Sequence, residues 1–231
     1  MIGAVLVTGA SGFLGQAVVP RLLEKGCTVH ALSRHPLSNS DGVVPLAGDI
    51  TKPNLGLASC PDGIEAVLHM AALLDLTERH RDRVWEVNVT GTQNVLEFCS
   101  RHRVHRLFFV STAYTKGRNT YERSKARAES MVMQSGLHTT ILKPSILIGD
   151  SQMHGLPPPG NFYTVTSAVD RVKRWVETTA GLPQLKLTIR LPGNPEGELN
   201  LIPVDRAAEG IVEAVVQDKA CLLYTSPSPR D

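Results

Sequence analysis

The sequence predicts an α/β fold in which helices cover both faces of a parallel sheet. Short, apolar, β-branched runs alternate with longer segments whose apolar residues recur at helical spacing. The first run, residues 4–7, leads directly into glycines at positions 9, 12 and 15, and a helical segment follows to Lys25-Gly26. With 231 residues, the chain can bury one sizeable core and still form a smaller lobe.

A strand, a glycine turn and a helix in this order are typical of a Rossmann-type doubly wound sheet that binds a dinucleotide. Gly9 permits the tight turn, Gly12 lets a pyrophosphate approach the backbone, and Gly15 lets the helix pack close to the strand. The free N–H groups that begin the helix then face the phosphates. We expect this turn to contribute six cofactor-binding residues: Gly9, Ser11, Gly12, Phe13, Leu14 and Gly15.

The second predicted strand, residues 28–32, ends at Ser33-Arg34. In a Rossmann-type sheet this strand end meets the adenosine ribose, where an acidic residue suits NAD and an arginine suits the 2′-phosphate of NADP. Ser33 and Arg34 therefore predict NADP as the cofactor, with NAD less favoured.

Residues 42–46 and 64–70 are predicted to form the third and fourth strands. The fourth ends in Ala71 and Ala72, and such small side chains would let the cofactor lie against the backbone. We interpret His69, within the same strand, as a packed residue rather than a catalyst.

A long helix is predicted over residues 77–102, with Asn88 and Gly91 in its middle. Both residue types lower helix stability, so a local requirement is expected there. Further strands are predicted over residues 107–111 and 139–147, on either side of a helix over 121–134.

Tyr121 and Lys125 are the candidate catalytic pair. They stand four residues apart on one helix and therefore share a face. A nearby ammonium stabilises a phenolate, so we expect Lys125 to lower the pKa of Tyr121 toward the working pH of a general acid. Thr112 follows the fifth strand and can direct a hydroxyl at the same carbonyl oxygen.

Together these motifs resemble the extended short-chain dehydrogenase/reductase superfamily over about residues 2–217. The resemblance implies catalysis by Thr112, Tyr121 and Lys125, with Ser111 as the substitute for Thr112. It also implies that Asp49 faces the adenine amino group and that Asn88 supports the active site. The cofactor site implied in this way adds Asp49, Ile50, Asn88, Lys125, Pro144 and Ser145.

Four segments are similar to one branch, the thioester reductases and fatty acyl-CoA reductases of the male-sterility type; they cover residues 111–114, 121–125, 144–151 and 201–205. Two features depart from that branch. Only eight residues separate Thr112 from Tyr121, and Lys143 stands where arginine is common.

The expected function is therefore NADP-dependent hydride transfer to a small-molecule carbonyl or acyl thioester, a class that includes carrier-linked and CoA-linked thioesters. A nucleotide-sugar epimerase/dehydratase and a hydroxysteroid-type dehydrogenase are alternatives on the same scaffold. A non-catalytic NADP-sensing regulator is an alternative of another class.

Composition and residue spacing argue against several other classes of protein. The net charge of +2 and the absence of interleaved aromatics argue against nucleic-acid binding, and no apolar run is long enough to span a membrane. Neither cysteines nor histidines show metal-ligand spacing, so no metal site is expected. The chain enters its first strand at once, and we expect a cytoplasmic protein.

Three regions are predicted: a nucleotide-binding domain over residues 1–155, a partial substrate lobe over 156–220, and a tail over 221–231. A Pro/Gly-rich hinge at residues 156–160 opens the lobe, and within it we expect a helix over 161–179, strands over 185–191 and 199–204, and a last helix over 205–217. The tail resembles the translation of a sequencing-library adapter, so we expect it to lie outside the fold. On this interpretation the native chain continues beyond Ala220, and the incomplete lobe would leave catalysis weak.

Overall fold

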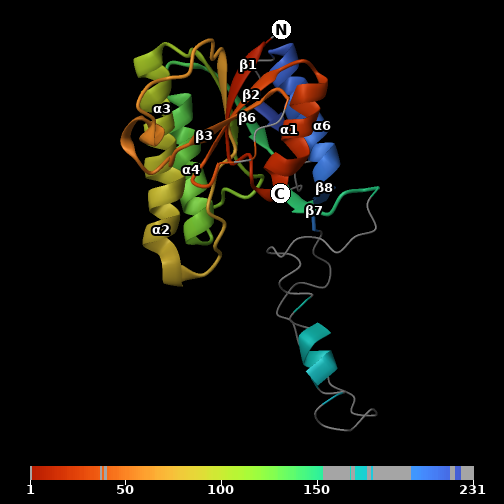
Figure 1. Cartoon of the computed structure of the whole chain (residues 1–231). Helices are drawn as coiled ribbons and strands as arrows, with labels where there is room; N and C mark the ends of the chain where they lie inside the picture. The colour runs from red at the N-terminus through yellow and green to blue at the C-terminus, as the bar shows by residue number, and fades with distance from the viewer. Residues whose placement is uncertain are drawn as a thin grey trace.

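The computed structural model describes residues 2–36, 38, 41–152, 167, 170–175, 178, 199–218 and 222–224. Its centre is a sheet in the order β3-β2-β1-β4-β5-β6-β9 (Figure 1). All neighbouring strands in it run parallel, which confirms the doubly wound Rossmann-type class. The strands are β1 Ala4–Thr8, β2 Thr28–Ser33, β3 Val43–Ala47, β4 Ala66–His69, β5 Arg106–Val110, β6 His138–Lys143 and β9 Leu222–Tyr224.

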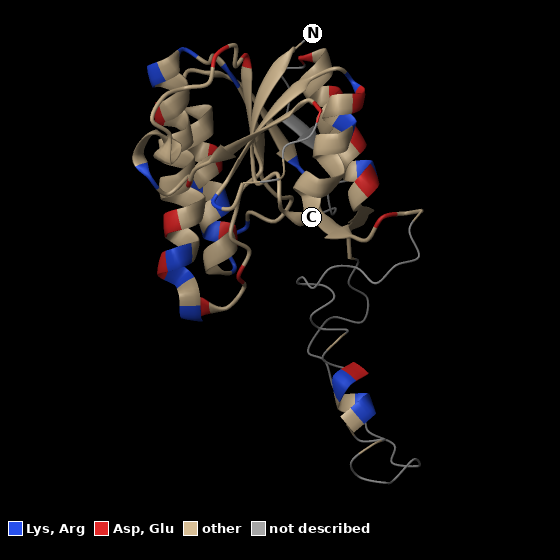
Figure 2. Ribbon diagram, in the orientation of Figure 1, with Lys and Arg blue, Asp and Glu red and all other residues tan. Residues whose placement is uncertain are grey.

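Helices cover both faces of this sheet (Figure 1). One face carries α2 (Arg81–Trp85), α3 (Gly91–His102) and α4 (Thr120–Met133), and the other carries α1 (Phe13–Glu24) and α6 (Val204–Gln217). Side chains alternate along β1, so Val5 and Val7 enter the core beneath α1 and α6, whereas Leu6 enters the opposite core. Charged residues lie on the outward faces of the helices, and the sheet is almost free of them (Figure 2).

The predicted helix over residues 77–102 is present but not uniform. A 3₁₀ turn, Glu78–His80, precedes α2, and a π-helical turn, η3 (Glu86–Thr90), joins α2 to α3. Asn88 lies inside this π turn, a type of irregularity often found at functional sites. Gly91 comes directly after this turn. Glycine suits the position because a Cβ there would lie 2.7 Å from Ile50 Cδ1.

The predicted strand over residues 139–147 is interrupted at Pro144, which has no N–H for a sheet hydrogen bond. Its second part becomes β7 (Ile146–Ile148), which pairs in parallel with β8 (Leu201–Pro203) in a separate two-stranded sheet. The interruption turns the chain away from the main sheet just beyond the predicted site residues Pro144 and Ser145.

The last long helix requires a correction. We expected residues 205–217 to belong to the substrate lobe, but α6 packs against α1 and the main sheet. Ile211 and Val215 are fully buried in that core because α6 is strongly amphipathic and its apolar stripe meets the apolar face of α1. The predicted hinge at residues 156–160, most of the helix over 161–179 and the strand over 185–191 lie outside the described residues.

The tail also differs from expectation, since Leu222–Tyr224 forms β9 and pairs in parallel with β6 at the edge of the sheet. Strand β6 would otherwise lie at the edge of the sheet, where its backbone N–H and C=O groups are unpaired. A short segment such as β9 can pair with them. Within the described ranges, no helix has the length and apolar character needed to cross a membrane.

Candidate active site and cofactor cavity

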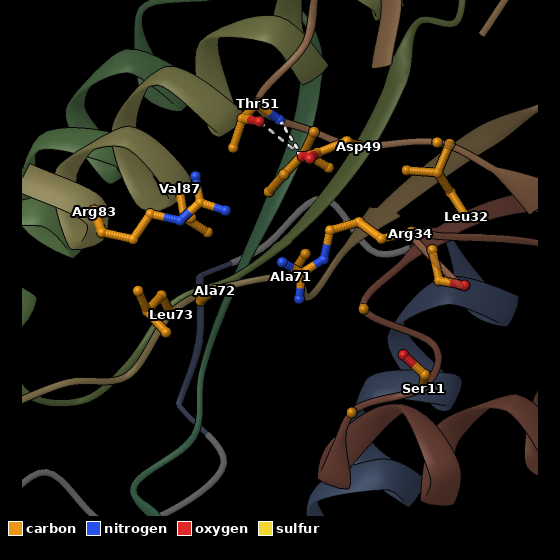
Figure 3. A pocket seen from close by; sticks show the side chains of 15 residues that line it. Ser11, Leu32, Arg34, Asp49, Thr51, Ala71, Ala72, Leu73, Arg83 and Val87 are labelled. Atoms are coloured by element: carbon orange, nitrogen blue, oxygen red, sulfur yellow. Dashed lines mark hydrogen bonds between the residues drawn. The ribbon is translucent and has the colours of Figure 1, made fainter. Parts of the chain in front are cut away.

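A cavity of about 280 Å³ opens at the carboxyl ends of β1, β2, β3 and β4 (Figure 3). This is the edge of a doubly wound sheet at which ligands bind. Residues from five separate segments line it: Gly9, Ser11, Gly12, Leu32, Ser33, Arg34, Gly48, Asp49, Ile50, Thr51, Ala71, Ala72, Leu73, Arg83 and Val87.

The glycine turn has the geometry of a phosphate cradle. Gly9 has φ +79°, and a Cβ there would lie 2.7 Å from the backbone nitrogen of Ala71. At Gly15 a Cβ would lie 2.3 Å from the carbonyl oxygen of Gly9, so only glycine lets α1 begin so close to the turn. Gly12 precedes α1 and is exposed at the cavity, so the first N–H groups of the helix face the space where an anion would lie. The residues present therefore fit a dinucleotide.

Nine of the predicted cofactor residues line this cavity, namely Gly9, Ser11, Gly12, Ser33, Arg34, Asp49, Ile50, Ala71 and Ala72. The other seven do not: Phe13, Leu14, Gly15, Asn88, Lys125, Pro144 and Ser145. Sequence reasoning missed Arg83 and Val87, which share a helical face four residues apart and could have been found by following that spacing.

The start of α4, which carries Tyr121, is held by three side chains. Asn119 caps the helix and accepts a hydrogen bond from the Glu122 backbone N–H at 2.8 Å. Glu78 accepts from the Thr120 N–H at 3.1 Å and from its hydroxyl at 2.6 Å. The Glu122 carboxylate accepts from the Arg118 N–H at 3.0 Å, in the manner of a capping box. Tyr121 therefore projects from a fixed first turn.

The pKa of Tyr121 is the second correction. Burial, and then the Glu122 carboxylate, raise the pKa of Tyr121 to about 12, opposite to the direction expected. The Lys125 Nζ donates instead to the Val110 carbonyl oxygen at 2.8 Å and lies 4.3 Å from the centre of the Phe109 ring. Burial lowers the pKa of Lys125 to about 7, so its charge is partial near neutrality and can stabilise a phenolate only weakly.

The hydroxyl groups of Thr112 and Ser111 make different hydrogen bonds, which distinguish the two candidates. The Ser111 hydroxyl donates to the Glu129 carboxylate, which also accepts from the Lys143 Nζ at 3.0 Å. The Thr112 hydroxyl accepts from the Tyr114 N–H at 3.2 Å, and within the described part of the chain its own hydrogen has no acceptor. Of the two hydroxyls, Thr112 is the one that can donate to a substrate.

Asn88 connects the catalytic helix to the loop after β4. Its Oδ1 accepts from the Leu73 N–H at 2.7 Å, and its Nδ2 donates to the Leu73 carbonyl at 3.0 Å and to the Ser124 Oγ at 2.9 Å. Ser124 in turn donates to the carbonyl oxygen of Tyr121 at 2.7 Å. Because both amide hydrogens bind protein atoms, Asn88 is a positioning residue in this structure.

His69 is a buried strand residue, as predicted, and its tautomer is determined. The Thr92 hydroxyl donates to the Asn88 carbonyl at 2.7 Å, so it must accept from His69 Nε2–H at 3.1 Å. Thr8 Oγ1 accepts from the Ala71 N–H and donates to His69 Nδ1 at 2.7 Å. Burial lowers the pKa of His69 to about 3, so the ring is neutral and ties β1 and β4 to α3.

A family model described as "NAD dependent epimerase/dehydratase family" matches residues 5–219. The chain belongs to this family. The cavity at the carboxyl edge of the sheet is accordingly the candidate site for a nicotinamide dinucleotide. Among the described residues, no group of three or more His, Cys, Asp or Glu side chains could hold a metal ion.

Two curated relatives are named as a dehydrogenase and a reductase. A 3-beta-hydroxysteroid dehydrogenase of Mycolicibacterium neoaurum is 30% identical over 178 residues, which cover 64% of this chain and 48% of the relative. A 2-alkyl-3-oxoalkanoate reductase of Stenotrophomonas maltophilia is 28% identical over 245 residues, which cover 94% of this chain and 67% of the relative. The chain thus spans about half the length of the first and two thirds of the second.

Solved structures share the fold. The terminal R domain of the myxalamid PKS-NRPS biosynthetic pathway superposes with a TM-score of 0.76 at 23% identity, over 97% of this chain and 66% of that domain. MoeE5 in complex with UDP-glucuronic acid and NAD gives a TM-score of 0.72 at 22% identity, over 97% of this chain and 76% of MoeE5. At these identities the likeness is one of fold alone.

Proposed function

We propose that the protein is an NADP-dependent reductase that acts on a carbonyl or acyl-thioester carbon. The observation that carries the proposal is the glycine-lined cavity at the carboxyl edge of the sheet, together with Tyr121 and Lys125 four residues apart on α4. Tyr121 carries the proton that a reduction must deliver to the carbonyl oxygen. The helix that presents it is joined to the carboxyl end of β5 by the Lys125–Val110 hydrogen bond of 2.8 Å.

The chain would use three side chains in this reaction, while bound NADPH would supply the hydride. Thr112 donates a hydrogen bond to the carbonyl oxygen and orients it. Tyr121 donates its proton to that oxygen as the hydride adds to carbon, so a ketone becomes an alcohol. From a thioester the same addition gives a hemithioacetal, which loses the thiol and leaves an aldehyde. Lys125 supplies a partial positive charge four residues along the same helix.

The preference for NADP rests on Arg34. This exposed side chain lines the cavity next to the end of β2, and no described residue forms an ion pair with it. A guanidinium in that place suits the 2′-phosphate.

The reductase with the 3-oxoalkanoate substrate in its name supports the carbonyl substrate, since that similarity covers most of this chain. The thioester substrate, linked to a carrier or to CoA, rests on the motif resemblance and on the fold shared with an R domain. A 3β-hydroxysteroid dehydrogenase is the second candidate, because a relative of that name is 30% identical. A nucleotide-sugar epimerase would use the same Tyr121.

The test is a substrate panel for the full chain with NADPH, monitored by loss of the reduced nicotinamide absorbance. The panel contains a 3-oxoalkanoate, an acyl-CoA, a 3-ketosteroid and UDP-glucose, and Tyr121→Phe is the control. We expect consumption of NADPH with the oxoalkanoate or the acyl-CoA. Turnover restricted to the steroid, or UDP-sugar epimerisation without net reduction, would replace the proposal with the corresponding alternative. Tight NADPH binding without turnover of any substrate would favour the sensor.

A further inference from the structure

Two arginines from different elements point into one end of the cofactor cavity. Arg34 follows β2, and Arg83 lies on α2, on the opposite side of the cavity (Figure 3). Asp49 lies at the same end. Burial raises the pKa of its carboxyl group, but the hydrogen bonds from Thr51, and then the two guanidiniums, lower it overall. Like-charged groups that converge on one space repel each other, so the arrangement favours an anionic ligand between them.

The Asp49 carboxylate forms no ion pair with either arginine among the described residues. Its Oδ1 accepts from the Thr51 N–H and hydroxyl, both at 2.9 Å. Within the described part of the chain, neither Arg34 nor Arg83 lies within ion-pair distance of Asp49. The carboxylate is thus held by its own turn, and it remains available to the adenine amino group that the resemblance assigns to it.

Arg83 is held in place by Glu86, one helical turn further on. The Arg83 Nη1 donates to Glu86 Oε2 at 2.6 Å, with both side chains a little under half exposed. A guanidinium has five N–H donors in a planar fork, so one carboxylate oxygen leaves most of them for a ligand. Glu86 therefore orients the group at the rim of the cavity without using all of its hydrogen-bonding capacity.

We propose that Arg83 is a second phosphate-binding residue, which grips the 2′-phosphate of NADP together with Arg34 from the other side of the cavity. This rests on the proposed function, because it presumes that NADP is the cofactor. A phosphate monoester carries about −1.5 to −2 charges near neutral pH and has three strong acceptor oxygens, which two guanidinium forks can bind more completely than one. Two planar forks also fix the orientation of a phosphate better than one.

The experiment compares adenosine 2′,5′-bisphosphate with 5′-AMP by calorimetric titration of the full chain, because these probes differ only in the 2′-phosphate. Arg83→Gln should weaken binding of the bisphosphate about tenfold or more and leave binding of 5′-AMP unchanged. Arg83→Lys keeps the positive charge but loses the planar fork of N–H donors. Its affinity for the bisphosphate should lie between those of the wild type and Arg83→Gln. Arg81→Gln is the matched control, since Arg81 lies on the same helix, 71% exposed, and does not line the cavity.

Each other outcome has a distinct meaning. If Arg83→Gln weakens both probes equally, Arg83 contacts the adenosine rather than the phosphate, and the inference is overturned. If Arg34→Gln abolishes the preference while Arg83→Gln does not change it, Arg34 alone recognises the phosphate; the inference then fails and the choice of NADP stands. If the unmodified protein binds both probes equally, the proposed NADP dependence fails first.

Discussion

Lys125 and Glu129 show how the buried charges of the site are balanced. Both lie on the inner side of α4, and the Glu129 carboxylate faces Lys143 from β6, Ser111 from the end of β5, and Lys125 one turn earlier. Lys125 itself meets the Phe109 ring and the Val110 carbonyl. Burial lowers the pKa of Lys125 to about 7, and Glu129 opposes that shift. Lys125, the proposed catalytic lysine, is therefore close to its titration point at neutral pH.

This gives a stability prediction for Lys125→Met. In the unfolded chain a lysine holds its proton up to about pH 10, whereas in the folded chain Lys125 releases it near pH 7. Between these values the unfolded state binds more protons, so the wild type gains stability as pH rises. The gain relative to the variant is at most about 1.4 kcal/mol per pH unit. Urea unfolding of both proteins at pH 7 and pH 9 measures it, and parallel pH dependences would show that Lys125 is not buried as described.

Tyr121→Phe tests the acid directly. We expect turnover to fall by about 10²–10⁴-fold, because the proton donor is lost, while NADPH binding changes little. Cofactor titration and steady-state kinetics on the same preparation separate the two effects. A phenylalanine variant that turns over normally would remove Tyr121 from the mechanism.

At the scale of elements, two buried asparagines connect the α2–α3 helical region to different halves of the site. Asn88, in the π turn, reaches Leu73 and Ser124 near the catalytic helix. Asn94, two turns further on, donates to the Ile50 carbonyl at 2.7 Å, beside the cofactor cavity. On the proposed function, this helical region would support the chemistry through Asn88 and the dinucleotide through Asn94.

The variants Asn88→Ala and Asn94→Ala should therefore affect different kinetic parameters. Each leaves a buried backbone group unpaired, at a cost of about 1–3 kcal/mol in stability. Asn88→Ala should lower kcat by up to about 10²-fold, because Tyr121 loses its positioning, with the KM for NADPH little changed. Asn94→Ala should raise the KM for NADPH with a smaller effect on kcat. Equal changes in both parameters for both variants would mean that the asparagines only stabilise the fold.

The sequence was sufficient to predict β1 to β5 and the glycine turn, because these depend on local periodicity and on the backbone freedom of Gly9. It could not predict the π turn at Asn88, since that irregularity is stabilised by partners 15 and 36 residues away along the chain. The pKa of Tyr121 was mispredicted for a similar reason. Helical spacing places Lys125 on the correct face, but only the tertiary structure shows that its Nζ turns to the Val110 carbonyl.

At the scale of the whole molecule, α6 is part of the nucleotide-binding core. Ile211 and Val215 are fully buried against the same core as Val18 and Leu22 of α1. A helix assigned to a separate lobe from its position in the chain thus completes one face of the main sheet. The local pattern predicted its length and amphipathicity, but it carried no information on which surface the apolar stripe would meet.

Hydrogen exchange tests this placement. Amides of α6 should exchange as slowly as those of α1, because the two helices share one cooperative core. Ile211→Ala should lower the free energy of unfolding by about 2–5 kcal/mol. Leu199→Ala, at a position 65% exposed, is the control and should change it by less than about 0.5 kcal/mol. Fast exchange throughout α6 together with slow exchange in α1 would show that α6 belongs to a separate lobe and not to the core of α1.

The packing of α6 on α1 also has a consequence for biosynthesis. Val204 follows Glu24 by 180 positions, and a ribosome adds about 5–20 residues per second, so the two helices are separated by roughly 9–36 s of translation. During that time the apolar stripe of α1 around Val18 and Leu22 has no helical cover on a nascent chain. The central strand β1 is made first, yet the face beneath α1 can close only after α6 has been made. This interval is when a chaperone would bind the chain, and when premature release would lead to aggregation.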